Sequence, residues 1–215
     1  MNLLPFTQLF AAVGFILGAY GIYRRYAQTK RRPLSADRSA LKGNPAHGIA
    51  YAFTAGMMPW AKESTRLHMI AYLRGIGFHL GIFLALLALL ESPLWGLYPP
   101  LLKTVTEWGL WGGALLGAAG GIMRLVDHNL RGLSLPDDHF AIWLTTLLMA
   151  VTALGLASPG VRAVMYLVAG ITLIYIPLGK IRHCLYFFFS RLFFGKFFGR
   201  RAVLPHPDPT AQRRP

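Results

Sequence analysis

Hydrophobic residues gather along the chain in five long runs, which short polar or proline-containing segments separate. A helix needs about 20 mostly apolar residues to cross a bilayer, and each run approaches or exceeds that length. The pattern predicts five transmembrane helices with the approximate bounds 4–23, 64–90, 108–126, 139–157 and 161–189. The expected fold class is therefore an all-α integral membrane protein, built as a five-helix bundle.

Serine, proline and glycine mark where these helices start, break and pack. Ser64 is expected to cap the start of the second helix, and the Ser-Pro-Gly sequence at 158–160 is expected to end the fourth. Pro177 lies inside the fifth run, where it removes a backbone hydrogen bond and is expected to kink the helix. Glycines that recur every four residues predict a face for close packing on the third helix: Gly113, Gly117 and Gly121.

Two aromatic segments have the character of the membrane interface. Residues 56–60 are apolar but too few to span a bilayer, and residues 187–198 interleave phenylalanines with two cations. We therefore expect a five-helix membrane domain at 1–190, followed by a basic interfacial helix and cytoplasmic tail at 191–215.

The composition fits a membrane protein, since 54% of the residues are hydrophobic and only 14% are charged. A net charge of +14 can indicate nucleic-acid binding, but these cations lie beside apolar runs and form no soluble aromatic-basic surface. We therefore expect no nucleic-acid partner. Membrane lipids with anionic headgroups and an acidic protein face are the expected partners.

Most cations lie on one side of the predicted membrane. Residues 24–74, 124–131 and 180–214 contain 20 of the 22 Lys and Arg residues, which leaves Lys103 and Arg162 on the other side. Because cytoplasmic loops carry the excess of Lys and Arg, the N-terminus is expected to face outward and the C-terminus to face the cytoplasm. The expected location is the inner (cytoplasmic) membrane, which the chain crosses several times.

Histidines are the candidates for chemistry. The single cysteine, Cys184, has no C-x-x-C partner and no finger spacing, so a redox cofactor must use other ligands. Five histidines lie in polar flanks, in a turn or at a helix mouth, where water can satisfy them: His47, His68, His128, His139 and His206. His79 and His183 lie within membrane runs, where an imidazole without a partner is costly, and they are therefore functional candidates.

His79 and His183 are expected at similar depth near the cytoplasmic side. His79 lies about 7 Å deeper than Arg74 at 1.5 Å per residue, and His183 closely follows Lys180 and Arg182. Two imidazoles that face each other across a bundle can ligate haem iron, and these three cations are candidate partners for the haem propionates. Glycines beside His79 leave room for a porphyrin: Gly75, Gly77 and Gly81. The alternative, in which each histidine hydrogen-bonds a helix carbonyl, stays open at this stage.

Two segments of the chain resemble a known family. They are 73–90, with Phe78-His79-Leu80-Gly81, and 167–191, with Gly170-Ile171-Thr172-Leu173, Pro177-Leu178-Gly179-Lys180 and His183. They are similar to the gamma subunit of respiratory nitrate reductase and to its relatives in sulfur-metabolising membrane complexes. The similarity covers all five runs in order, including the turn that ends in Pro136-Asp137-Asp138. It implies a five-helix cytochrome b that exchanges electrons between a quinol and iron–sulfur subunits on the cytoplasmic side.

The resemblance implies one haem b in this chain. Members of the family with two haems have a cytoplasmic-side histidine pair, which His79 and His183 match, and an outer pair, which falls at Leu89 and Met165 here. Leucine does not bind iron, and Met165 therefore lacks a partner ligand. A second pair made of His68 and His139 is an alternative that the sequence leaves open.

The quinone is expected close to the remaining haem. The nearest hydrogen-bond donors in sequence are His68, Arg74 and Trp60, and the quinone is menaquinone or ubiquinone. Each residue also has an ordinary role: His68 in water, Arg74 on a propionate or lipid phosphate, and Trp60 as an interfacial anchor.

These features predict an electron-transfer subunit of a quinone-linked oxidoreductase complex, which is not a complete enzyme alone. The alternative is a haem-free structural membrane anchor for a soluble redox subunit. A transporter is a weaker third hypothesis, since apart from the proline kink the runs show no broken helices or charges near the membrane midplane.

Overall fold

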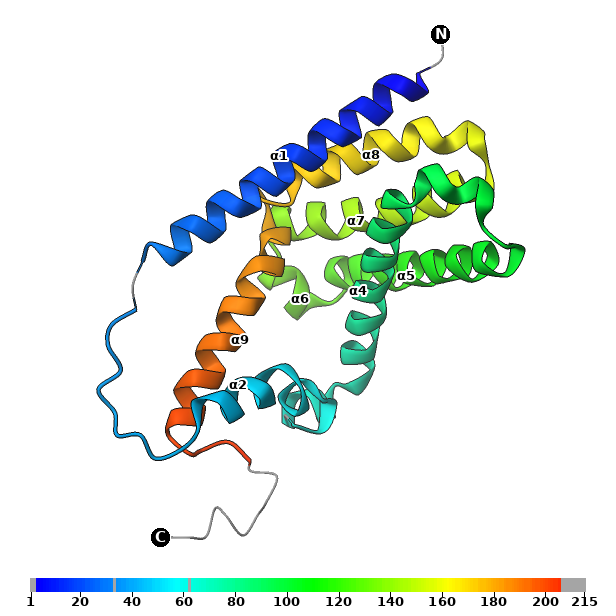
Figure 1. The fold of residues 1–215 in the computed structure, drawn as a ribbon. Helices are drawn as coiled ribbons and strands as arrows, with labels where there is room; N and C mark the ends of the chain where they lie inside the picture. Colours follow the sequence, from blue (N-terminus) through cyan, green and yellow to red (C-terminus); the bar gives the residue numbers. More distant parts are fainter. Residues whose placement is uncertain (1–2, 33, 62, 206–215) are drawn as a thin grey trace. The chain divides into compact units, whose positions relative to one another are not determined.

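The computed structural model describes residues 3–32, 34–61 and 63–205, and it contains helices but no strands over these residues (Figure 1). The α-helices are α1 (Leu4–Lys30), α2 (Pro45–Phe53), α3 (Glu63–Leu67), α4 (Met69–Leu90), α5 (Pro100–Val126), α6 (His128–Leu133), α7 (Pro136–Ala157), α8 (Arg162–Tyr175) and α9 (His183–Arg200). Short 3₁₀ turns connect them: η1 (Ala55–Met57), η2 (Pro59–Ala61), η3 (Ser92–Leu97), η4 (Pro159–Val161) and η5 (Lys180–Arg182).

Four of the described helices are long and apolar enough to cross a membrane: α1, α4, α5 and α7. The segments Pro159–Tyr175 and Lys180–Arg200 pass the same test together, with a break between them, which makes up to five spans. Many large apolar side chains on these helices are exposed, as lipid-facing residues are: Ile16, Leu80, Phe83 and Leu115. The chain is therefore an all-helical protein of multi-pass membrane type, as the sequence predicts.

Several helix ends differ from the sequence prediction. The second helix is interrupted at His68, and Ser64 lies inside α3 rather than at its cap, because α3 begins at Glu63. The third helix begins at Pro100, earlier than expected, because proline fits the first turn of a helix, where its missing N–H is not needed. The expected kink at Pro177 is confirmed as a full interruption, since regular α-helix ends at Tyr175 and resumes at His183.

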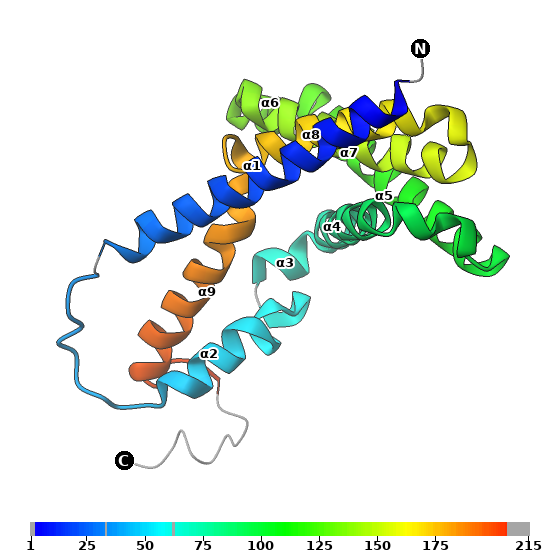
Figure 2. The ribbon, with the colours of Figure 1, turned by 45° about the horizontal axis from the view of Figure 1, so that its top comes forward.

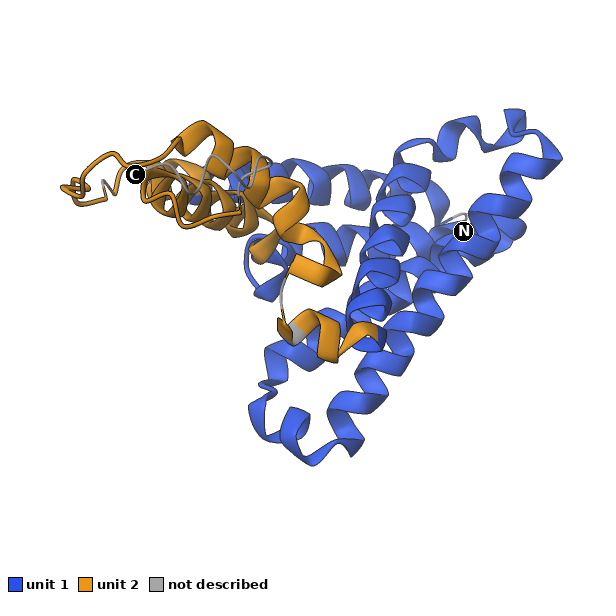
Figure 3. Ribbon diagram, turned by 90° about the horizontal axis from the view of Figure 1, so that it is seen from below, with its two compact units in different colours: residues 1–25, 70–182 blue, residues 26–69, 183–215 orange. Residues whose placement is uncertain are grey.

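The chain forms two compact units (Figure 3). Unit 1 comprises Met1–Arg25 and Ile70–Arg182, and unit 2 comprises Tyr26–Met69 and His183–Pro215. The expected boundary at 190/191 falls inside α9. The predicted boundary separates residues that enter the membrane from residues that do not, and it stays a prediction.

Small residues bring the helices of unit 1 into close contact. A Cβ atom added to Gly113 of α5 would lie 2.7 Å from the Gly81 backbone of α4 and 2.8 Å from the Met149 sulfur of α7. Gly117 faces Thr146 and Phe78 in the same way, and Gly121 faces Trp143. The packing role that the four-residue glycine spacing predicts is confirmed.

Helix α1 lies beside α8, as two views of the molecule show (Figures 1 and 2). Gly14 contacts the backbone of Gly170, and Gly18 contacts the backbone of Leu173. Further along, Gly21 lies against the ring of Pro177. The first helix is thus held on α8 by a row of glycines that the sequence analysis did not single out.

Unit 2 is built on close contact between α2 and α9. Gly48 of α2 approaches the backbone of Gly195 and Gly199 so closely that a side chain at any of these positions would clash. The Asn44 side chain caps α2 by accepting hydrogen bonds from the backbone N–H groups of Ala46 and His47. These contacts hold α2 against α9.

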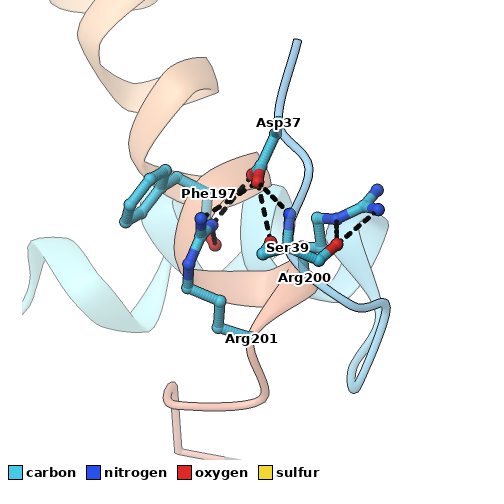
Figure 4. Close-up of polar contacts among 5 residues, drawn as sticks. All are labelled: Asp37, Ser39, Phe197, Arg200 and Arg201. Atoms are coloured by element: carbon cyan, nitrogen blue, oxygen red, sulfur yellow. Dashed lines mark hydrogen bonds and ion pairs between the residues drawn. The ribbon is translucent and has the colours of Figure 1, made fainter.

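The C-terminal end of α9 is joined to the segment that precedes α2 (Figure 4). Arg201 donates hydrogen bonds of 2.9 and 3.0 Å to the Asp37 carboxylate, and its guanidinium carbon lies 3.5 Å from the centroid of the Phe197 ring. Arg200 donates to the Ser39 carbonyl at 2.9 and 2.7 Å. The hydrogen bonds from Arg201, and then those from Ser39, hold the pKa of the Asp37 carboxyl well below its usual range.

Candidate functional site

His79 lies on α4 in unit 1, with its ring exposed at the protein surface. The ring atom Nδ1 is 2.7 Å from the carbonyl oxygen of Gly75, one helical turn earlier. Because a carbonyl only accepts hydrogen bonds, Nδ1 is the donor, and in the neutral imidazole the lone pair is on Nε2. This is the tautomer of a histidine that binds a metal through Nε2 while its other ring nitrogen is held by a carbonyl.

The glycines beside His79 have different surroundings. A Cβ atom added to Gly75 would meet nothing within 4 Å, so the helix surface there is open. Gly77 lies against Leu116, and Gly81 lies against Gly113, both on α5. Of the three glycines expected to make room for a porphyrin, Gly75 fits that role, whereas Gly77 and Gly81 serve contacts between helices.

His183 is the first residue of α9, in unit 2, and its side chain is exposed. It directly follows η5, so the break introduced around Pro177 places it at a helix start rather than inside a continuous helix. The pairing of His79 with His183 stays a prediction from the sequence.

The three cations expected to bind propionates all have protein partners. Lys180 forms an ion pair with Asp138, with 2.5 Å between Nζ and Oδ1. Arg182 donates from Nη1 to the carbonyl oxygen of Leu178 at 3.1 Å. Arg74 extends over α5, where its guanidinium contacts the Met123 sulfur. A propionate would therefore share or replace these partners.

The residues expected near a quinone are not grouped in unit 1. Trp60, in η2, is 68% exposed, and His68 is exposed between α3 and α4. Both belong to unit 2, whereas Arg74 belongs to unit 1.

The alternative ligand His139 lies in the first turn of α7, and its buried Nδ1 has no hydrogen-bond partner among the described residues.

The positions of the family's outer histidine pair are filled by core packing. Met165 is fully buried, and its sulfur lies against Gly155. Leu89 packs against the same apolar core. Nearby, Arg162 donates to the Gly155 carbonyl at 3.2 Å and lies 5.5 Å from the Trp95 ring. This end of unit 1 is thus occupied by its own side chains.

Sequence reasoning missed a polar cluster at the start of α7. The Tyr175 hydroxyl donates a hydrogen bond to the Asp137 carboxylate, next to the ion pair between Asp138 and Lys180. Beside it lies an apolar groove of about 270 Å³. Its lining comes from α1, α7, α8 and the break that follows α8: Phe10, Phe140, Ile171, Ile174, Tyr175 and Leu178. The Pro136-Asp137-Asp138 sequence was noted only as a turn, and no sequence signal pairs it with Tyr175.

Over the residues that the structure describes, no three His, Cys, Asp or Glu side chains come together as a metal site. A haem with two imidazole ligands requires only two protein ligands, so this finding does not bear on His79 and His183. Comparisons with known proteins found no matching family model, no matching curated protein and no matching solved structure.

Proposed function

We propose that this chain is a haem b-containing membrane subunit of a respiratory or redox complex. It passes electrons between the membrane quinone pool, menaquinone or ubiquinone, and an iron–sulfur subunit on the cytoplasmic side. His79 and His183 would hold the iron of one haem. The observation that supports this proposal most directly is the hydrogen bond from His79 Nδ1 to the Gly75 carbonyl, because it leaves the Nε2 lone pair as the metal-binding one.

The haem, when bound, supplies a one-electron redox centre. The protein's part is to hold both imidazoles, because two histidine ligands leave no open coordination position and favour electron transfer over oxygen chemistry. The Gly75 carbonyl orients the His79 ring and raises the basicity of Nε2. Arg74, Lys180 and Arg182 are the proposed propionate partners, which supply charge-assisted hydrogen bonds.

One haem, rather than two, is proposed because the outer positions hold Leu89 and Met165. The burial of Met165 against Gly155 supports this number, since that part of unit 1 is already filled. For the quinone, His68, Arg74 and Trp60 remain the donors proposed from the sequence. None of them lines the groove beside Tyr175.

The proposed location is the inner membrane, with the N-terminus outside and the C-terminus in the cytoplasm. Unit 2 carries the exposed cations Arg38, Lys42 and Lys196, which are suited to an acidic face of the iron–sulfur subunit. These cations support the cytoplasmic side as the docking side.

A haem-free membrane anchor is the second candidate. The same bond between His79 and the Gly75 carbonyl favours it, because a helix carbonyl one turn away also satisfies a structural histidine. The two functions differ in one measurable property, which is the haem content.

Haem content is tested on the chain purified after expression with sufficient haem, by pyridine haemochrome analysis and by oxidised and reduced absorption spectra. We expect one b-type haem per chain, lost in His79→Ala and in His183→Ala. The matched control is His128→Ala, because His128 is exposed at the start of α6 and is not a proposed ligand. Purified chain without haem, or a normal low-spin spectrum in His79→Ala, would contradict the proposal.

A further inference from the structure

The break between α8 and α9 lacks the continuous hydrogen-bond ladder of a helix. Regular α-helix ends at Tyr175, and Pro177 has no N–H group to donate. Within the break, the N–H groups of Leu178 and Gly179 both donate to the Tyr175 carbonyl, at 3.0 and 2.9 Å. The turn η5 then leads directly to His183, the first residue of α9. The conformation of the segment that precedes His183 therefore depends on contacts with other helices.

Two acidic residues of α7 hold this break. The Tyr175 hydroxyl donates to the Asp137 carboxylate and accepts a hydrogen bond from the backbone N–H of Lys180. The Lys180 side chain forms the 2.5 Å ion pair with Asp138. The Tyr175 ring also packs edge to face on Phe140, with 4.8 Å between the ring centroids. We call Asp137, Asp138, Tyr175 and Lys180 the α7 clasp, because they join both ends of the break to the start of α7.

The α7 clasp is anchored on the α7 side by the Asp138 carboxylate. Its second oxygen, Oδ2, accepts the Leu135 N–H at 2.9 Å, which satisfies a backbone donor at the helix start. The Asp138 side chain is only 11% exposed, so both of its oxygens are engaged with little access to water. The Lys180 ammonium carries three hydrogens, and its ion pair with Asp138 is therefore compatible with the proposed propionate contact.

Further contacts fix the middle and the end of the break. A Cβ atom added to Gly21 of α1 would lie 2.5 Å from the Pro177 ring. Arg182 donates to the Leu178 carbonyl at 3.1 Å, which closes the end of the break on itself. Arg182 is joined to His183 by one peptide bond, and consecutive Cα atoms are about 3.8 Å apart. Contacts that fix the break therefore also fix the point at which α9 starts.

We propose that the α7 clasp positions His183 as a haem ligand. The inference rests on the proposed function, in which His183 holds the haem iron. Metal ligands must be held within about 0.5 Å of the productive geometry, and residues outside the ligand shell supply that precision. Asp137 and Asp138 are positioning residues in this sense, because in the proposed site they hold neither the iron nor a propionate and act only through the break.

Two variants loosen the clasp in different ways. Tyr175→Phe removes the hydroxyl that bridges Asp137 and the Lys180 backbone, and it leaves every charge in place. Asp138→Asn removes the ion pair with Lys180 but keeps an oxygen for the helix cap. Asp127→Asn is the matched control. It removes a carboxylate that caps α6 instead of holding the break, and asparagine caps a helix as well as aspartate does.

The stiffness of the break is measured without haem. Backbone hydrogen exchange is followed by mass spectrometry in peptides that cover residues 176–186, in full-length protein in lipid nanodiscs with a His79→Ala background. We expect Tyr175→Phe and Asp138→Asn each to speed exchange about tenfold, because each removes contacts that protect the break from opening. Exchange in Asp127→Asn is expected to match that of the His79→Ala parent.

The effect on the ligand is measured with His79 intact. The electron paramagnetic resonance signal of a low-spin haem depends on how its two ligand rings are oriented, so both clasp variants are expected to change its g values. Transfer of haem to apomyoglobin should become about tenfold faster in both. Asp138→Glu, which restores the carboxylate, should return both properties toward the wild type. Tyr175→Phe excludes a purely electrostatic effect, because it changes no charge.

Unchanged exchange in both clasp variants would overturn the inference, because the clasp would then not hold the break. Faster exchange with unchanged g values and haem transfer would also overturn it, as would equal changes in Asp127→Asn. Haem content separates these results from the proposed function. A wild-type chain without haem overturns the proposed function and the ligand role of the clasp together, whereas a haem-containing wild type with unaffected variants overturns only the positioning role.

Discussion

A histidine in a membrane helix has two ring nitrogens to satisfy, and in His79 the backbone satisfies one of them. The hydrogen bond to Gly75 fixes the ring against α4 and sets the tautomer. Gly75 at the same time leaves the adjacent helix surface open. Gly75 thus supplies both the carbonyl that orients the His79 ring and the open space beside it.

Because Gly75 has both roles, adding one methyl group at this position is expected to affect haem binding. Gly75→Ala is expected to leave the fold unchanged, because a Cβ atom there meets nothing within 4 Å, but to lower haem occupancy or shift the reduced spectrum if the porphyrin lies on this face. The measurements are the haem-to-protein ratio and the thermal unfolding midpoint. Gly112→Ala is the matched control, since that glycine is also open. Identical spectra in the two variants would show that the haem lies elsewhere.

Glycines position the helices of unit 1, and the glycine spacing allowed this packing to be predicted from the sequence. The four-residue spacing of Gly113 and Gly117 gave the packing face of α5 directly, because residues four apart share a helix face. The helices that pack against this face could not be predicted, because the spacing of the α5 glycines does not identify Gly81 or Thr146 as their contacts. A proline in an apolar run predicted a kink, and the structure shows a longer interruption there, from the end of α8 at Tyr175 to the start of α9 at His183.

The Tyr175 and Asp137 pair shows why part of the site was missed. The two residues are 38 positions apart, and each is unremarkable in its own segment. Their contact arises because the end of α8 lies next to the start of α7 in the folded chain. Hydrophobic periodicity cannot predict such a tertiary contact. The single histidines, by contrast, stood out from the sequence because an imidazole is rare in an apolar run.

Close packing on α5 predicts a large difference between neighbouring glycines. Gly113→Val is expected to destabilise unit 1 by about 1–3 kcal/mol or more, because the new side chain meets the Gly81 backbone, which cannot yield as a flexible side chain can. Gly112→Val is expected to cost far less, since that position is open. Unfolding in detergent, followed by circular dichroism, measures both variants. Equal loss of stability would mean that the crossing of α4 and α5 is not tightly packed.

At the scale of the whole molecule, charge is distributed unevenly, and the basic segments have ordered structure. In unit 2 the segment before α2 is joined to α9 through Asp37, Arg201 and the Ser39 carbonyl. Arg38 and Lys42 lie in this non-helical segment, which these contacts join to α9, and Lys196 lies on α9 itself. A fixed arrangement of charge is what specific docking of an acidic partner requires.

Docking of the proposed iron–sulfur subunit is expected to depend on salt and on individual cations of unit 2. Lys42→Glu and Lys196→Glu should each lower the amount of partner that co-purifies, by a few-fold, because an exposed ion pair contributes about 0.2–1 kcal/mol and is screened by salt. Lys103→Glu is the control, as this cation lies on the predicted outer side. A partner retained equally by all three variants would argue against docking through unit 2.

The sidedness of the chain follows from the same asymmetry, and cysteine labelling measures it. In a Cys184→Ser background, Lys42→Cys places one thiol at an exposed position of the segment expected to face the cytoplasm. A membrane-impermeant maleimide should therefore label this variant in inside-out vesicles and not in right-side-out ones. In the same Cys184→Ser background, Lys103→Cys should show the opposite pattern, because Lys103 lies in the first turn of α5, on the predicted outer side. The reverse result for both cysteines would invert the chain, and it would place the cationic surface of unit 2, with any partner it docks, outside the cell.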